Sequence, residues 1–173
     1  MKTTPPGQKK DAGAGEGSPA GDPLLKLELR SDPGLLCAVR GAVERLTEAL
    51  GFSAADGRAV TRAVDEALTN IIRHAYAGAP DQLIEVVFRA TRRPGAEGAA
   101  VGLEIVMSDQ GQAVDPEKLC GRALHDVKPG GLGLHFIRES MDVVEFKRAN
   151  EANYLRLVKY VRAPKETANL VKR

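Results

Sequence analysis

Asp65-Glu66-Ala67-Leu68-Thr69-Asn70-Ile71-Ile72-Arg73-His74-Ala75-Tyr76 is the stretch that decides how this sequence is interpreted. Its apolar residues recur at helical spacing, which predicts the end of an amphipathic helix. Glu66, Asn70 and His74 follow one another at intervals of four residues, so they form a row along one edge of the apolar stripe. The row predicts either a set of site residues beside a cleft or the ordinary polar flank of a half-exposed helix.

Each residue type in this row has a chemical use if a cleft lies above it. The amide oxygen of Asn70 is a hard ligand of the kind that Mg²⁺ accepts, with phosphate oxygens completing the coordination. The carboxylate of Glu66, one turn earlier, can take a proton from a hydroxyl group or a water that attacks a γ-phosphate. The row alone leaves both interpretations open.

The sequence around this helix predicts alternating short elements. Asp32 and Ser53 are candidate N-caps of two helices, and Gly51 can end the first of them. We expect strands at 24–30, 83–89, 101–107, 143–147 and 154–161, and helices at 33–50, 53–76 and 132–141. This order predicts an α+β fold, a two-layer sandwich in which helices cover a mixed β-sheet.

The composition excludes several classes of protein. The 173 residues suit one domain, while the net charge of +2 and the aromatic content of 4% argue against a nucleic-acid partner. No apolar run approaches the roughly 18 residues of a membrane span, and the beginning of the sequence lacks an apolar leader. The two cysteines, Cys37 and Cys120, lack the spacing of a metal site. We expect a cytoplasmic protein with a disordered tail at 1–23, a folded domain at 24–162 and a basic tail at 163–173.

Two further segments carry residues suited to a nucleotide. Asp109 follows a predicted strand, and its carboxylate can accept a hydrogen bond from an exocyclic amine such as that of adenine, beside Gly111. The glycine-rich segment 130–134 precedes a helix, and such a segment can surround phosphates with its N–H groups. It matches neither a P-loop nor a dinucleotide-binding motif. When each segment is considered alone, an alternative remains open. The segment at Asp109 can be an ordinary turn, and the glycine-rich segment can be a flexible hinge before a helix.

Together the three segments resemble the Bergerat-type ATP-binding domain of histidine kinases, DNA gyrase and heat-shock protein 90. Within this group the sequence is most similar to the bacterial anti-sigma-factor serine/threonine kinase family. The resemblance covers about residues 24–162 and rests on 65–76, on Ser108-Asp109-Gln110-Gly111 with Asp115-Pro116, and on Gly130-Gly131-Leu132-Gly133-Leu134. Ala113 stands where many Bergerat domains carry a second glycine.

The resemblance implies a role for each motif residue. Glu66 would be the general base, and Asn70 would hold Mg²⁺ against the phosphates. Asp109 would bind the adenine amine, with Gly111 beside the base. The other ATP-binding residues would be His74, Lys128, Gly130, Gly131, Gly133 and Leu134. Lys128 is included because its charge lies just before the glycines.

The resemblance also implies a function. The protein would be a homodimeric serine kinase that uses Mg·ATP to phosphorylate a STAS-type anti-sigma-factor antagonist and that sequesters a sigma factor. An alternative is a non-catalytic ATP-binding module that acts only by sequestering a partner, although ATP binding alone needs no base at Glu66. A kinase with a STAS target and no sigma factor is a third possibility, which the sequence does not separate from the first. No direct nucleic-acid or membrane partner is expected.

Overall fold

The structure is a computed structural model, and it describes residues 22–95, 101–113 and 132–162. The strands are β1 (Leu25–Arg30), β2 (Leu83–Arg92), β3 (Val101–Asp109), β4 (Val143–Ala149) and β5 (Ala152–Tyr160). The helices are the 3-10 helix η1 (Pro33–Leu35), α1 (Leu36–Ala49), α2 (Ala54–Asn70), the π-helix η2 (Ile71–Ala75) and α4 (Leu132–Ser140). The predicted elements are present in the predicted order.

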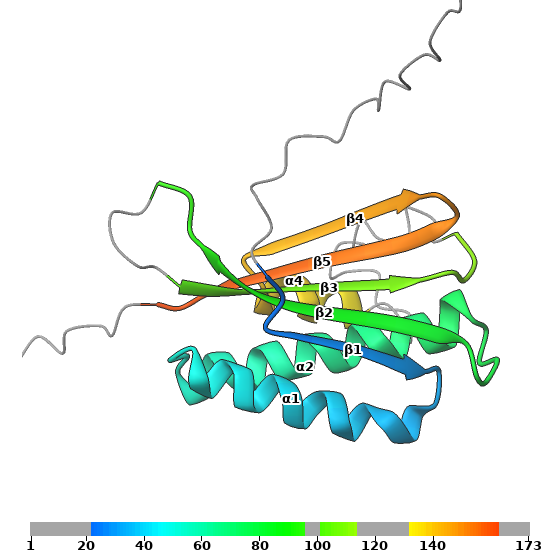
Figure 1. Ribbon diagram of the computed structural model, residues 1–173, viewed down its shortest axis with the longest axis horizontal. Helices are drawn as coiled ribbons and strands as arrows, with labels where there is room; N and C mark the ends of the chain where they lie inside the picture. The colour runs from blue at the N-terminus through cyan, green and yellow to red at the C-terminus, as the bar shows by residue number, and fades with distance from the viewer. Residues whose placement is uncertain (1–21, 96–100, 114–131, 163–173) are drawn as a thin grey trace, which may run out of the picture.

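The strands form one sheet in the order β1-β2-β3-β5-β4, and the helices α1, α2 and α4 cover one of its faces (Figure 1). This arrangement confirms the predicted α+β fold with two layers. One detail of the prediction is wrong, because the four strand pairings of the described residues are all antiparallel and the sheet is not mixed.

The connections explain the antiparallel pairing. Two successive helices, α1 and α2, return the chain to the end of the sheet where β1 finished, so β2 runs back alongside β1. The single helix α4 makes β4 run in the same direction as β3, but β5 lies between these two strands. A parallel neighbour pair therefore never forms.

Two side chains begin the helices as the sequence predicts. Asp32 accepts a hydrogen bond from the Gly34 N–H at 2.8 Å at the start of η1. Ser53 accepts one from the Asp56 N–H at 3.1 Å at the start of α2. Each cap satisfies a backbone donor that has no partner inside the helix.

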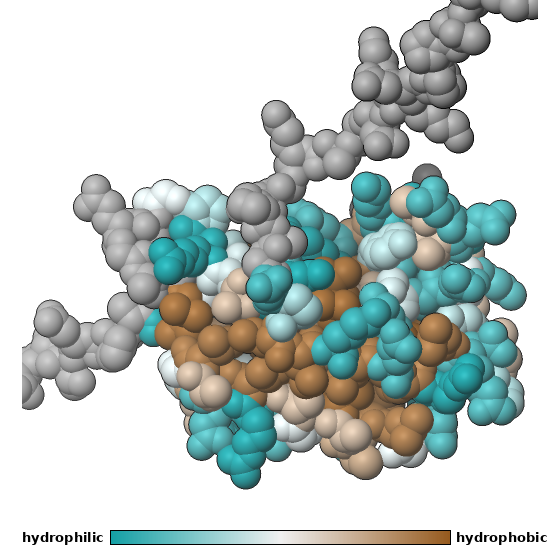
Figure 2. Space-filling view, in the orientation of Figure 1, coloured by the Kyte–Doolittle hydropathy of each residue, from teal (hydrophilic) through white to brown (hydrophobic). Residues whose placement is uncertain are grey.

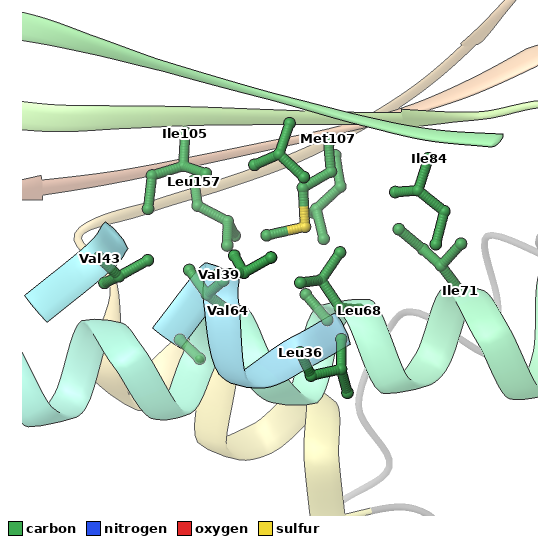
Figure 3. Packing of buried hydrophobic residues seen from close by; sticks show 14 of the residues in the cluster. Leu36, Val39, Val43, Val64, Leu68, Ile71, Ile84, Ile105, Met107 and Leu157 are labelled. Atoms are coloured by element: carbon green, nitrogen blue, oxygen red, sulfur yellow. The ribbon is translucent and has the colours of Figure 1, made fainter. Parts of the chain in front are cut away.

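The hydrophobic core lies between the helices and the face of the sheet that they cover (Figure 3). Alternate residues of each strand point toward the helices, as the twofold period of a strand requires. Burying one such Leu, Ile or Val side chain contributes roughly 1.5–3 kcal/mol. The side chains that meet there include Val39, Val43, Val64, Leu68, Ile84, Ile105, Met107 and Leu157.

Apolar surface also reaches the outside along the seam where β1 lies beside α1 (Figure 2). The leucines just before these two elements are partly exposed, Leu24 by 47% and Leu35 by 39%. Among the helices of the described ranges, none has both the length and the apolarity to cross a membrane.

The face of the sheet away from the helices carries a chain of ion pairs. Glu104 on β3 accepts a hydrogen bond from Nε of Arg156 on β5 at 2.6 Å, and Nη1 of Arg89 on β2 lies 3.9 Å from its second oxygen. Arg156 also donates to Glu145 on β4 at 2.9 Å. Since the Glu104 side chain is only 16% exposed, these pairs connect four strands in a partly desolvated environment.

Candidate nucleotide-binding site

The row of polar residues lies on α2, but the helix changes its winding after Asn70. Residues 71–75 form the π-helix η2, in which the Tyr76 N–H donates to the Ile71 carbonyl at 3.0 Å, five residues back. A π-turn is wider than an α-turn, so His74 does not continue the row above Asn70 as a regular helix would place it. The His74 side chain is exposed, whereas Glu66 and Asn70 are half-buried.

The end of η2 packs against the turn that follows β3. The Gln112 N–H donates to the Ala75 carbonyl at 2.8 Å. A Cβ atom added at Gly111 would lie only 2.5 Å from this carbonyl oxygen and 2.6 Å from its carbon. Because the neighbouring atoms belong to the backbone, only glycine fits at this position.

Tyr76, the residue after η2, holds the same turn through its hydroxyl group. The hydroxyl donates to the Leu83 carbonyl at 2.6 Å and accepts a hydrogen bond from the Gln110 N–H at 3.0 Å. Burial raises the pKa of the Tyr76 phenol, the charge of Asp109 raises it further, and the Gln110 N–H offsets part of this rise. The phenol therefore stays protonated at neutral pH and can act as both donor and acceptor.

Asp109 ends β3 at this corner and is buried. Its Oδ1 accepts hydrogen bonds from the Gly111 N–H at 2.9 Å and from Nδ2 of Asn153 at 2.8 Å. Within the described residues, Oδ2 has no hydrogen-bond partner. This arrangement leaves one carboxylate oxygen to accept a hydrogen bond from a ligand, such as an exocyclic amine.

The sequence interpretation assigns no site role to three residues of this corner, Tyr76, Asn153 and Arg148, although Tyr76 ends the motif at 65–76. Asn153 occupies a position on β5 whose neighbours on the same side, Leu155 and Leu157, are buried apolar residues. The sequence offers one signal for Asn153, because it is a polar residue at a strand position that faces the core. No local pattern singles out Arg148.

At the other end of the row, the structure brings Glu66 and Gly133 together. An added Cβ at Gly133 would overlap the Glu66 carboxylate, with its Cδ at 2.6 Å and its Cγ at 2.8 Å. Arg62 on α2 stacks over the Phe136 ring on α4 at 3.9 Å, which fixes the two helices against each other. Leu134 packs against the hydrophobic core.

The site thus has two ends along one helical axis. Glu66 lies on α2 and Ala75 ends η2, nine residues further along the same continuous helix. Asn70 lies between the two ends, and its side chain makes no hydrogen bond to the described residues, so its amide oxygen is available to a hard cation such as Mg²⁺. The described residues contain no group of three or more His, Cys, Asp or Glu side chains placed to hold a metal ion. The predicted residues Lys128, Gly130 and Gly131 lie outside the described residues.

Comparisons with known proteins show the family to which this fold belongs. Residues 29–159 match the histidine kinase-like ATPase domain family. The chain is 34% identical over 105 residues to the serine/threonine-protein kinase BtrW of Bordetella bronchiseptica, an alignment that covers 58% of this chain and 68% of BtrW. It is 31% identical over 126 residues to the serine-protein kinase RsbW of Halalkalibacterium halodurans, covering 63% of this chain and 66% of that protein.

A solved structure shows the same fold. It is a chain in the crystal structure of the SiaB–SiaC complex from Pseudomonas aeruginosa, with a TM-score of 0.52 and 13% sequence identity. The likeness covers 80% of this chain and 91% of that chain. The protein therefore belongs to the histidine kinase-like ATPase domain family and is a relative of the bacterial serine kinases BtrW and RsbW.

Proposed function

We propose that this protein is a serine kinase that transfers the γ-phosphate of Mg·ATP to a serine of a STAS-type anti-sigma-factor antagonist. One observation carries the proposal. A carboxylate suited to act as a base, Glu66, lies on α2 beside Gly133, and a carboxylate suited to bind adenine, Asp109, ends β3 next to the turn that packs against the end of η2. The relatives BtrW and RsbW, which are serine kinases, support the same reaction.

In the proposed reaction, Glu66 accepts the proton of the substrate serine hydroxyl. The serine oxygen then bonds to the γ-phosphorus as the bond between this phosphorus and the β–γ bridging oxygen breaks, which releases ADP. When bound, Mg²⁺ neutralises charge on the phosphate oxygens, and Asn70 would be its protein ligand. Asp109 and Gly111 would hold the adenine.

The remaining ATP-binding residues of the proposal would shape the phosphate lid or line the nucleotide pocket. Gly133 lies beside Glu66 at the start of α4 and would place backbone N–H groups near the γ-phosphate. Lys128 would add a positive charge to this end of the site. The other members of this group are His74, Gly130, Gly131 and Leu134.

The first test is a calorimetric titration of Mg·ATP into the wild-type protein and into Asn70→Ala, each repeated with EDTA. We expect the wild type to bind at micromolar strength, and we expect both the substitution and EDTA to weaken binding about tenfold or more. Cys37→Ser, an exposed substitution on α1, is the control and leaves binding unchanged. A wild type that binds no nucleotide would contradict the proposal.

The second test separates a kinase from a non-catalytic module. Glu66→Gln removes the base and keeps the shape of the side chain, so it should retain ATP binding and lose phosphotransfer to a STAS-type antagonist by about a hundredfold or more. If phosphotransfer is absent in the wild type as well, partner sequestration without catalysis becomes the function.

We also propose that the protein sequesters a sigma factor and forms a homodimer. Both parts rest on the resemblance to anti-sigma-factor kinases. Sedimentation analysis of the purified protein tests the dimer. Co-purification with the sigma factors of the source organism, with and without ATP, tests sequestration. Phosphotransfer to an antagonist without sigma binding would place the kinase in a different signalling circuit.

A further inference from the structure

The buried corner around Asp109 is completed by two residues from the β4–β5 hairpin. Asn153 on β5 is almost fully buried at 1% exposure, and it faces Asp109 across the paired strands β3 and β5. Its Nδ2 donates both to Oδ1 of Asp109 at 2.8 Å and to the Gln112 carbonyl at 3.1 Å. Both N–H groups of the Asn153 amide are therefore used.

Arg148 on β4 determines which way this amide points. Its Nη1 donates to Oδ1 of Asn153 at 2.6 Å and to the Gly111 carbonyl at 3.3 Å. Since a guanidinium group can only donate, it requires the amide oxygen of Asn153 on its own side. The amide nitrogen then points to the acceptors, which are Asp109 and the Gln112 carbonyl.

The consequence for Asp109 is a single defined orientation. Both hydrogen bonds that Asp109 accepts from the described residues fall on Oδ1, and the donors Gly111 and Asn153 suit a carboxylate that acts only as an acceptor. Oδ2 is left toward a ligand. Adenine offers an N–H donor at its six position, whereas guanine offers a carbonyl acceptor, which an acceptor-only carboxylate repels.

We propose that Asn153 is a positioning residue that presents Asp109 to adenine and sets the preference for ATP over GTP, and that Arg148 fixes the orientation of the Asn153 amide. The inference rests on the proposed binding of adenine by Asp109. It assigns the β4–β5 hairpin, which contains none of the predicted motif residues, to nucleotide selection.

The main test uses Asn153→Asp, which keeps the shape of the side chain and replaces its N–H donors by an acceptor. Two facing carboxylates cannot both be ionised at hydrogen-bonding distance, so the pair retains a shared proton at low pH. The other titratable groups that face this pair among the described residues are Arg148 from β4 and Tyr76 after η2. Burial raises the pKa of the Tyr76 phenol, so this group does not titrate in the pH range of the test.

Affinities for Mg·ATP and Mg·GTP are measured by calorimetry at about pH 6 and about pH 8. The affinity of each variant is then divided by the affinity of the wild type at the same pH. We expect the wild type to prefer ATP by about tenfold or more. Asn153→Asp should bind ATP about tenfold more weakly than wild type near pH 8 and recover most of this loss near pH 6. A loss without pH dependence, or an unchanged preference for ATP, would overturn the inference.

A second variant keeps the inference testable if Asn153→Asp fails to fold. Arg148→Met removes an exposed cation from β4, and Lys147→Met removes the neighbouring cation, which points to the opposite face of the sheet. We expect Arg148→Met to lower the ATP-to-GTP preference severalfold with little change in melting temperature, and Lys147→Met to leave it unchanged. Equal behaviour of the two variants would count against the role of Arg148. If the wild type binds neither nucleotide, the proposed function itself fails.

Discussion

Tyr76 joins three elements through one hydroxyl group, since it follows η2 and bonds to Leu83 at the start of β2 and to Gln110 after β3. We predict that Tyr76→Phe lowers the free energy of unfolding by about 1–2 kcal/mol at neutral pH, because two partners lose a hydrogen bond. The measurement is urea denaturation of both proteins.

The same residue predicts a pH dependence. The pKa of the Tyr76 phenol is raised in the folded state, mainly by burial and further by Asp109. A raised folded pKa contributes stability that is complete below the unfolded pKa of about 10 and is lost as the pH rises through the folded pKa. The difference between the wild type and Tyr76→Phe should therefore narrow above about pH 10. A difference that stays constant or widens there would contradict the assignment.

Gly133 is the residue whose replacement should disturb the proposed base most directly. Gly133→Ala places a Cβ atom against the Glu66 carboxylate, which must turn aside, so we expect a loss of up to about 1 kcal/mol in the free energy of unfolding. In a Glu66→Ala background the same substitution should cost little, because the obstructing group is gone. A double-mutant cycle by thermal denaturation measures this coupling.

Gly41→Ala is the matched control for Gly133→Ala. Gly41 lies within α1, and nothing approaches within 4 Å of its added Cβ. This substitution should stabilise the protein by up to about 1 kcal/mol, since alanine favours a helix more than glycine does. If the cost of Gly133→Ala is the same with and without Glu66, the contact between these two residues is not its cause.

At the scale of elements, the β4–β5 hairpin depends on a two-residue turn. Asn150 and Glu151 have φ values of 50° and 65°, the left-handed conformation that such a tight turn requires at both positions. Asparagine tolerates this conformation, whereas glutamate is strained in it.

We predict that Glu151→Gly stabilises the protein by about 0.5–1 kcal/mol, because glycine adopts positive φ without strain. Asn150→Gly should stabilise the protein less than Glu151→Gly does. Denaturant midpoints of the two variants and the wild type provide the comparison. A destabilised Glu151→Gly would show that the Glu151 side chain has a compensating contact.

At the scale of the whole molecule, the ion pairs on the face of the sheet away from the helices connect strands that are far apart in the sequence. Glu104→Gln should lower the free energy of unfolding by about 1–3 kcal/mol, because Arg156 and Arg89 lose their shared partner in a partly desolvated environment. Glu48→Gln, which breaks the exposed pair with Arg45, should cost less than about 0.5 kcal/mol. Equal costs in chemical denaturation would contradict this difference.

Local sequence patterns account for the elements of this fold, and they fail where distant segments meet. The caps Asp32 and Ser53 and the apolar stripe of α2 are local, so the helices could be predicted. The antiparallel sheet could not, since it depends on β5 entering between β3 and β4.

The same division applies to the candidate site. Glu66, Asn70 and Asp109 belong to short motifs and could be named from the sequence. Arg148 and Asn153 could not, because they reach Asp109 only through the pairing of β3 with β5 and of β5 with β4. The π-turn after Asn70 was also hidden, since its apolar residues fit an ordinary helix equally well.

The position of β5 between β3 and β4 has a consequence for the time course of folding. Two of the four strand pairings, β2 with β3 and β4 with β5, are hairpins, whereas the pairings of β1 with β2 and of β3 with β5 each close a long loop. Non-local pairings form slowly because the chain must be ordered before the contact is gained. The two hairpins should therefore form early, and the corner around Asp109 should form in a later, slower kinetic phase, when β5 pairs with β3.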